Sequence, residues 1–339
     1  MAEPIKIAVD AMGGDNSPKK IIQGISHHSK NSENIDYKIF GDENQIKLLV
    51  DKHPIKNKFS IIHAPEKILN DDSALAAAKR GKNTSMWMSI ESVKKEETDI
   101  ILSAGNTGAL FVIAKLNLQM IDNIDKPALS ALWPNKNGMN VVLDLGANIE
   151  CNEKNLTDFS LMGASLHKAL YPDEDVKVAL LNIGSEEIKG NTIIKNTYKN
   201  LSSNNHSNYK FCGYIEGNQL MDGKVNVIVT DGFTGNVALK TAEGTANFIT
   251  SELKTALTNN IFGRISSFIN FKNLKKFKKK LDPRLYNGAI LLGLKSPVIK
   301  SHGGTDYIGF ANSLSVCEKI IKGKFCLLYT SDAADDDHC

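Results

Sequence analysis

The residues with the clearest chemical potential lie in a turn at 231–236, with the sequence Asp-Gly-Phe-Thr-Gly-Asn. A run of β-branched side chains at 227–229 precedes the turn and is typical of a buried parallel strand, and helix-forming residues follow from Ala238. Glycine lets the backbone approach a ligand closely, and the first amides of a helix have no partner within it. Such a turn favours an anion, phosphate above all. Many α/β proteins place glycine at such a turn for tight packing alone, so one turn does not establish a site.

The same pattern recurs at four other predicted strand ends. Each apolar run leads into a turn that combines glycine with Asn, Asp or Ser, at residues 10–15, 103–109, 144–148 and 182–191. A further glycine-bearing turn occupies 301–306. In a parallel sheet the carboxyl ends of the strands lie along one edge, where open α/β folds bind their ligands. The sequence therefore predicts that the five turns lie together at one edge.

Length and composition are those of an ordinary globular protein. The 339 residues suffice for a large core, and the net charge of +3 is too small to indicate a nucleic-acid partner. The five cysteines form no CxxC pair, which favours reduced thiols in a cytoplasmic protein. A strand begins after four residues, so we expect no signal peptide. No apolar run approaches the roughly 20 residues that span a bilayer.

Strand and helix signals alternate along the chain, which predicts a doubly wound parallel sheet. We expect strands at 5–9, 37–40, 59–63, 99–102, 141–143, 176–181, 227–229, 289–294 and 297–299. We expect helices from about Pro18 and at 44–51, 71–81, 86–95, 108–120, 152–170, 189–201 and 233–258, with a last one ending near residue 321. The predicted fold is a Rossmann-like, three-layer α/β/α arrangement with a mostly parallel sheet, formed by one domain over residues 1–323.

A basic amphipathic segment at 259–281 differs from the rest of the chain. Its apolar residues have nearly helical spacing and alternate with arginine and lysine. Such a segment suits an anionic membrane surface. A helical hairpin packed in a dimer, or a solvated lysine face over core phenylalanines, would show the same pattern. The residues expected to contact the membrane are Ile261, Phe262, Ile265, Phe268, Phe271 and Lys272. The acidic, low-complexity stretch at 324–339 is predicted to be a non-native tail.

Several common enzyme signatures are missing. The sequence has no GxGxxG after its first strand, no GxxxxGK[ST] and no GxSxG, which argues against nicotinamide binding, nucleotide hydrolysis and a hydrolase serine. Glycine, asparagine, small hydroxyls and a few charges remain at the strand ends. This set can bind phosphate and stabilise an oxyanion without a covalent nucleophile.

Five of these turns together resemble the motif series of the bacterial PlsX family, the phosphate acyltransferases of phospholipid synthesis. The resemblance runs in order and spacing from about residue 5 to 322, through the turns at 10–15, 103–109, 144–148, 186–191 and 231–237. The family more often has glycine where Ile188 stands, and the acidic tail departs from it.

The resemblance implies an enzyme that makes acyl phosphate from acyl-(acyl carrier protein) and inorganic phosphate, with no cofactor and no metal. It also implies a fold similar to phosphate acetyltransferases and to the isopropylmalate dehydrogenase type. Family members are homodimers that associate peripherally with the inner face of the cell membrane. A glycerol-3-phosphate acyltransferase would use their product downstream.

The candidate catalytic residues are Lys189, Asn236, Asp231 and His302. Lys189 would carry charge to phosphate or to the developing oxyanion, and asparagine amides would donate hydrogen bonds. Each role has an ordinary alternative: a surface lysine at a turn, a turn-forming asparagine, a helix cap and a structural histidine. The candidate phosphate- or substrate-binding residues are Asp10, Gly13, Gly14, Arg80, Gly105, Asn106, Thr107, Gly146, Asn148, Gly232, Thr234 and Gly235. For Arg80 the alternative is a solvated helix face.

Two other functions remain open from the sequence. One is a phosphate acyltransferase that uses acyl-coenzyme A as donor. The other is a membrane-bound scaffold whose site has degenerated.

Overall fold

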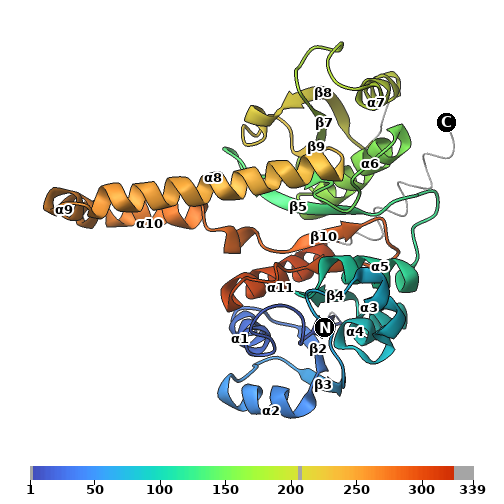
Figure 1. Ribbon diagram of the computed structural model, residues 1–339, viewed down its shortest axis with the longest axis vertical. Helices are drawn as coiled ribbons and strands as arrows, with labels where there is room; N and C mark the ends of the chain where they lie inside the picture. The colour runs from blue at the N-terminus through green and yellow to red at the C-terminus, as the bar shows by residue number, and fades with distance from the viewer. Residues whose placement is uncertain (1–2, 205–207, 324–339) are drawn as a thin grey trace.

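The computed structural model describes residues 3–204 and 208–323, without the side chain of Arg80, and Figure 1 shows its two halves. The predicted tail and part of the polar loop after residue 202 lie outside the described residues. The strands are β1 (Ile5–Asp10), β2 (Ile35–Gly41), β3 (Phe59–His63), β4 (Ile100–Ser103), β5 (Ala128–Pro134), β6 (Met139–Leu143), β7 (Lys177–Asn182), β8 (Lys210–Glu216), β9 (Val227–Val229), β10 (Ala289–Leu292) and β11 (Val298–Lys300).

The α-helices are α1 (Lys19–His28), α2 (Glu43–Lys52), α3 (Ala74–Arg80), α4 (Ser85–Lys94), α5 (Thr107–Leu118), α6 (Glu153–Leu170), α7 (Thr192–Ser203), α8 (Gly232–Thr258), α9 (Ile261–Ile269), α10 (Phe271–Lys280) and α11 (Tyr307–Lys322). Short 3-10 helices are η1 (Gly81–Asn83), η2 (Gly217–Gln219) and η3 (Pro283–Tyr286). The predicted α/β class is confirmed.

One sheet runs through both halves in the order β3-β2-β1-β4-β11-β10-β5-β6-β9-β7-β8. The pairs within β3 to β11 are parallel, and so are those within β6 to β8. Between them, β11, β10, β5 and β6 pair antiparallel three times in succession. Because three reversals leave β6 opposed to β11, the two parallel groups run in opposite directions.

This reversal corrects one expectation. The turns after β1 and β4 follow strands that point to one edge of the sheet, whereas those after β6, β7 and β9 follow strands that point to the other. The five turns therefore do not lie along a single edge. The sequence gives no direct sign of this, because strand direction depends on which strands pair, and β5 was not predicted.

Helices cover both faces of the sheet because its strands alternate their apolar side chains. In β1, Ile7 and Val9 pack with isoleucines of α1 and with Phe310 of α11, whereas Ala8 faces the cluster of α4 and α5. In the other half, α6 and α7 cover the first face. The first turns of α8 cover the second face, where Ala238 packs near Trp133 and Ile228.

An arm of α8, α9 and α10 projects from this body (Figure 1). α8 has 27 residues, which makes it about 40 Å long, and only Gly232 and Gly235 at its start are buried. In α9 and α10 no residue is buried. In the described part of the chain, no helix combines the length and apolar character that crossing a bilayer requires.

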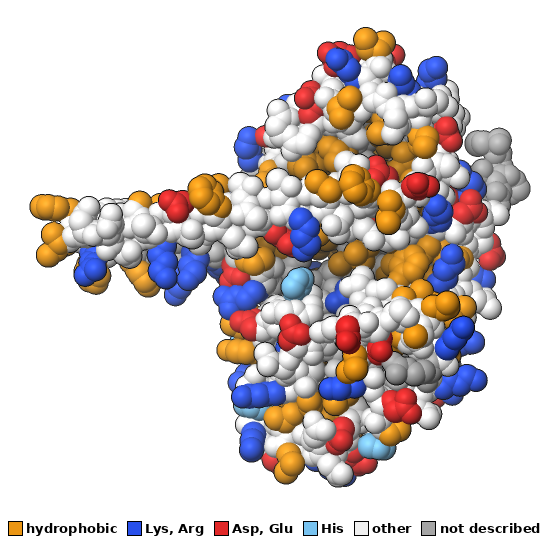
Figure 2. All heavy atoms as spheres, viewed as in Figure 1, with side chains coloured by type: hydrophobic (Ala, Val, Ile, Leu, Met, Phe, Trp, Pro, Cys, Tyr) orange, Lys and Arg blue, Asp and Glu red, His pale blue; other side chains and the backbone are white. Residues whose placement is uncertain are grey.

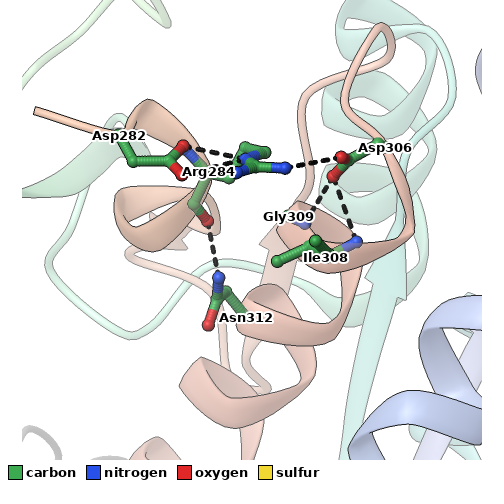
Figure 3. Close-up of polar contacts among 6 residues, drawn as sticks. All are labelled: Asp282, Arg284, Asp306, Ile308, Gly309 and Asn312. Carbon is green, nitrogen blue, oxygen red and sulfur yellow. Dashed lines mark hydrogen bonds and ion pairs between the residues drawn. The ribbon is translucent and has the colours of Figure 1, made fainter. Parts of the chain in front are cut away.

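The arm returns to the body through a polar junction at η3 (Figure 3). Arg284 Nη2 is 2.6 Å from Asp282 Oδ2, and its Nη1 is 2.9 Å from Asp306 Oδ2. The other oxygen of Asp306 accepts from the backbone N–H groups of Ile308 and Gly309 and so caps α11. The Asp306 carboxylate therefore fixes both the end of the arm and the start of α11.

Replacing Asp306 by alanine should remove the helix cap and the Arg284 partner together. We expect the free energy of unfolding to fall by about 1–2 kcal/mol, measured by urea denaturation. Asp122→Ala is the matched control, because Asp122 forms an ion pair with Lys295 at 3.1 Å but is 88% exposed and such pairs contribute about 0–1 kcal/mol. Equal losses in both variants would contradict the role given to the junction.

Candidate active site

Asp10 forms the centre of the first group of turns, which follow the parallel strands β1, β4 and β11. Its side chain is 1% exposed and accepts hydrogen bonds from Ser85 Oγ at 2.6 Å, Ser103 Oγ at 2.7 Å and the Met12 backbone N–H at 3.2 Å. Burial raises the pKa of Asp10, and the serine hydrogen bonds act in the opposite direction. Asp10 therefore holds together β1, β4 and α4, and no ligand is needed to explain its contacts.

The glycines beside Asp10 permit a very close approach between two turns. A Cβ on Gly13 would lie 2.6 Å from the backbone nitrogen of Gly105. Gly14 has a φ of +82°, and a Cβ there would lie 2.6 Å from the carbonyl oxygen of Ala104. Tight packing, the alternative noted from the sequence, accounts for these glycines at least in part.

Two buried lysines lie beside these turns and were missed in the sequence. Lys20 of α1 is 4% exposed, and its Nζ donates to the carbonyl of Gly303. Lys300, the last residue of β11, is 9% exposed and donates to the carbonyl of Ser301 at 2.5 Å. Burial lowers the pKa of Lys300 to about 8, and the charge of Lys20 acts in the same direction. Two features of the sequence could have indicated them: Lys20 adjoins Ile21 of a predicted buried helix face, and Lys300 directly precedes the turn at 301–306.

His302 follows Lys300 on this turn and is exposed. Its backbone N–H donates to Asn287 Oδ1 at 2.9 Å, and its Nδ1 accepts from the Gly304 N–H at 3.1 Å. Burial lowers the pKa of His302, and the positive charges of Lys300 and Lys240 lower it further. At neutral pH the imidazole is therefore neutral and can accept a proton.

Asp144 has the corresponding central place in the second group of turns, which follow β6, β7 and β9. It is fully buried and accepts from the backbone N–H groups of Leu129 at 3.0 Å, Ala147 at 2.9 Å and Asn148 at 2.7 Å. A Cβ on Gly235 would lie only 1.9 Å from the Asp144 carbonyl oxygen. The start of α8 can therefore pack on this turn only with glycine at 235.

Most of the asparagine amides have partners inside the protein. Asn106 Nδ2 lies within hydrogen-bonding distance of three carbonyl oxygens, and its Oδ1 caps α5 at the Ala109 N–H. Asn148 Nδ2 donates to the Pro127 carbonyl and to Asp144. Asn236 Nδ2 makes one longer contact, 3.3 Å to the Leu145 carbonyl, and Asn236 is exposed. Of the three, Asn236 is the one best able to donate to a ligand.

The remaining predicted residues have clear positions. Asp231 is the N-cap of α8: its oxygens accept from the Thr234 N–H and hydroxyl, both at 2.8 Å. Thr107 is an exposed residue in the first turn of α5. A Cβ on Gly146 would lie 2.9 Å from Asn236 Nδ2, and one on Gly232 would lie 2.5 Å from the Asn148 carbonyl. The side chain of Arg80 lies outside the described residues.

Lys189 lies in the turn between β7 and α7, which begins at Thr192 and not at Lys189 as expected. Asn182 Nδ2 donates to the carbonyls of Gly184 and Lys189 and so fixes the turn. Lys189 is exposed, and a Cβ on Gly184 would lie 2.9 Å from its Cγ. Among the described residues, no carboxylate forms an ion pair with its ammonium group.

The two groups of turns belong to different halves, and α8 approaches the first group from the second. Lys240 and Glu243 of α8 both influence the pKa of His302, so their charges lie close to that turn. Figure 2 shows the surface hollowed beneath the inner part of α8. Lys240 therefore lies close to His302, and Asn236 precedes Lys240 by about one helical turn on α8.

The described side chains at these turns can act through hydrogen bonds and charge. Cys151 lies near Asp144, but burial, and then the charge of Asp144, raises the pKa of its thiol to about 11. It is therefore a poor nucleophile at neutral pH. Within residues 3–204 and 208–323, no group of three His, Cys, Asp or Glu side chains is placed to hold a metal ion.

Comparison with known proteins first defines the class. The fold is that of the phosphotransacetylases: the enzyme from Streptococcus pyogenes superposes with a TM-score of 0.62 at 16% identity, covering 95% of this chain and 94% of that one. EutD phosphotransacetylase from Staphylococcus aureus gives 0.61 at 14% identity, with 94% of each chain covered. At these identities the likeness concerns the fold alone.

The particular family follows from the sequence. The sequence model of the fatty acid synthesis protein family matches residues 5–328. A phosphate acyltransferase from Pelagibacter ubique is 69% identical, over 95% of this chain and 97% of that protein. One from Maricaulis maris is 40% identical, over 94% and 92%. The chain belongs to this family of phosphate acyltransferases, and the resemblance noted in the sequence is confirmed.

The depressed pKa of Lys300 makes stability depend on pH. The unfolded chain keeps its proton up to about pH 10.5, whereas the native lysine releases it near 8, so native stability should rise between these values. Between about pH 7.5 and 9.5, wild type should gain about 2 kcal/mol relative to Lys300→Met, which has no titrating group there. Urea denaturation at both pH values measures the difference. A constant difference would show that Lys300 has an ordinary pKa.

Proposed function

We propose that the protein transfers an acyl group from the thioester of acyl carrier protein to inorganic phosphate, giving acyl phosphate and free carrier protein for phospholipid synthesis. The supporting observation is that Asn236 and Lys189 lie on neighbouring turns. β9 and β7 are adjacent, so the turns that follow them lie side by side. One turn offers an exposed amide, and the other offers an ammonium group without an ion-pair partner among the described residues.

The reaction needs orientation and charge stabilisation. A phosphate oxygen attacks the thioester carbonyl carbon, the carbonyl oxygen becomes an oxyanion, and collapse of the tetrahedral intermediate breaks the C–S bond. The thiolate leaves with the electron pair and takes a proton afterwards. Lys189 and Asn236 are suited to stabilise the oxyanion or hold the phosphate, and neutral His302 is suited to take the proton of the attacking phosphate.

The other predicted residues support this arrangement in different ways. Asp231 is a positioning residue, since it caps the helix that carries Asn236. Gly146, Gly232 and Gly235 allow close packing beneath Asn236, and Asn148 braces the same turn through Asp144. The exposed hydroxyls of Thr107 and Thr234, and Asn106 with the glycines around Asp10, remain proposed substrate contacts.

An acyl-coenzyme A donor and a degenerate scaffold are the two alternatives. The chain's basic character, with 41 Lys and Arg residues against 38 Asp and Glu, is too slight to choose between donors. Lys189 is exposed and has no ion-pair partner within residues 3–204 and 208–323, which favours an active enzyme over a scaffold. Release of thiol that depends on phosphate, assayed with each donor, separates all three possibilities.

We also propose that the arm holds a homodimeric enzyme against the inner face of the cell membrane. Phe262 and Phe268 are 80% and 84% exposed at the far end of the arm, and Ile261, Ile265, Phe271 and Lys272 are also largely exposed. Figure 2 shows basic side chains along one border of the same arm. Apolar insertion and lysine attraction would act together there. Membrane delivery suits an amphiphilic product that a glycerol-3-phosphate acyltransferase would consume.

Lys189→Ala should lower phosphate-dependent turnover at least tenfold. Loss of one preorganised oxyanion donor costs about 100- to 1000-fold in a well-studied case, and a lysine of mixed role can cost less. Turnover is measured as thiol release from acyl carrier protein. Lys199→Ala is the matched control, because Lys199 is exposed on the helix that follows this turn. Wild-type turnover in folded Lys189→Ala would refute the catalytic role.

The double variant Phe268→Glu with Phe271→Glu should lose binding to anionic liposomes in co-sedimentation. Each basic residue contributes roughly 1 kcal/mol near an anionic leaflet, so binding should also weaken with salt. Leu48→Glu with Leu116→Glu is the control, since both leucines are exposed on the body. Equal binding by wild type and the Phe variant would exclude the membrane role. Dissociation of a wild-type dimer in the Phe variant would place these residues at the subunit interface instead.

A further inference from the structure

The ammonium groups of Lys20 and Lys300 form a buried positive pair with little compensation. Each donates to one backbone carbonyl, of Gly303 and of Ser301, which leaves N–H groups on both for other partners. Among the described residues, no carboxylate lies within ion-pair distance of either. The nearest acidic influences are Asp15, which is exposed, and Asp10, whose oxygens are occupied by serine hydroxyls.

This arrangement costs free energy in the unliganded protein. Burial disfavours the charged form of both lysines, and the charge of Lys20 acts in the same direction on Lys300. A buried charge is tolerated when it is paired, and its partner here need not belong to the chain. An anion placed between the two ammonium groups would offset both penalties.

Glycine backbone lies directly beside the Lys20 ammonium group of this pair. A Cβ on Gly14 would lie 3.0 Å from Lys20 Nζ and 3.0 Å from the Gly303 carbonyl oxygen. Any larger residue at 14 would therefore fill the space directly beside the ammonium group. Gly303 and Gly304 follow on the facing turn, and the Gly303 carbonyl accepts from the Asp15 N–H at 3.0 Å. Gly14 and Gly303 thus place backbone without side chains next to the Lys20 ammonium group.

We propose that Lys20 and Lys300 bind a phosphate group, as the anion site of the half of the molecule that carries His302. The proposal rests on the phosphate acyltransferase function proposed above. A tetrahedral anion can accept hydrogen bonds from two ammonium groups at once. Two sources share this chemistry: the inorganic phosphate that reacts, and the phosphodiester of the donor's phosphopantetheine arm. The site lies beside His302, whose neutral imidazole would face the bound group.

The first test measures binding without catalysis. Wild-type protein is melted with increasing inorganic phosphate, and with sulfate, at constant ionic strength. We expect the melting temperature to rise by about 2 °C once the anion reaches roughly ten times its Kd. Lys20→Gln and Lys300→Gln should abolish the rise, and Lys19→Gln should keep it, because Lys19 is the exposed neighbour of Lys20 on the same helix. No rise in wild type, or an unchanged rise in either buried variant, would overturn the proposal.

The second test identifies the source of the phosphate. Each variant is assayed with an acyl carrier protein donor and with an acyl N-acetylcysteamine thioester, which has no phosphodiester. If inorganic phosphate binds here, its KM should increase about 10- to 100-fold with both donors. If the phosphodiester binds here, only the KM of the carrier-protein donor should increase. Unchanged KM values for all substrates would overturn the proposal.

A third measurement does not depend on the folding of the variants. Wild-type protein is crystallised with tungstate, a heavy tetrahedral anion located by its anomalous signal. Tungstate within hydrogen-bonding distance of both Nζ atoms supports the site, and tungstate bound only elsewhere overturns it. Anion binding here without any acyl transfer would leave this site standing and refute the proposed function, so the two failures are distinguishable.

Discussion

The antiparallel pairing of β10 and β5 in the middle of the sheet is the constraint on which the rest of the structure depends. It joins two parallel groups of strands into one sheet while reversing the direction between them. Each group then carries its own strand-end turns, centred on a buried aspartate: Asp10 in one half and Asp144 in the other. Reaction partners held by different halves must meet across the space between them. α8 provides the connection, since it begins on the Asp144 turn and carries Lys240 close to His302.

The two halves use their buried charges differently. Asp144 accepts hydrogen bonds from the backbone N–H groups of four residues and from the Asn148 side chain. Asp10 accepts from two serines and one backbone N–H, so both carboxylates are satisfied within the protein. Lys20 and Lys300 each have a backbone carbonyl as partner. A carbonyl dipole compensates an ammonium group less fully than a carboxylate would. Electrostatic demand for an anion therefore concentrates in the half that contains His302, whereas the exposed donors Asn236 and Lys189 belong to the other.

Local signals in the sequence predicted most elements and the α/β class, because apolar runs and glycine turns alternate regularly. They missed β5, where Ser130 interrupts the apolar run, and β8, where Lys210, Cys212 and Gly213 do the same. Without β5 the reversal of the sheet could not be inferred. Asn236 could be selected from the sequence because its glycine-bearing turn is distinctive, and its catalytic role is a proposal. Lys20 and Lys300 were not distinctive, since burial of a lysine depends on tertiary packing. The hydrogen-bond partners of Asn106 and Asn148 could not be predicted either, because they too depend on tertiary packing.

The arm and the His302 turn are connected by a short path of polar contacts. The arm ends at η3, where Arg284 joins Asp282 to Asp306, and the Arg284 carbonyl accepts from Asn312 of α11 (Figure 3). Three residues beyond Arg284, Asn287 accepts from the His302 N–H and donates to Ser301 Oγ and the Gly309 carbonyl. Both polypeptide segments that leave this junction are thus anchored to the turn that carries Lys300 and His302.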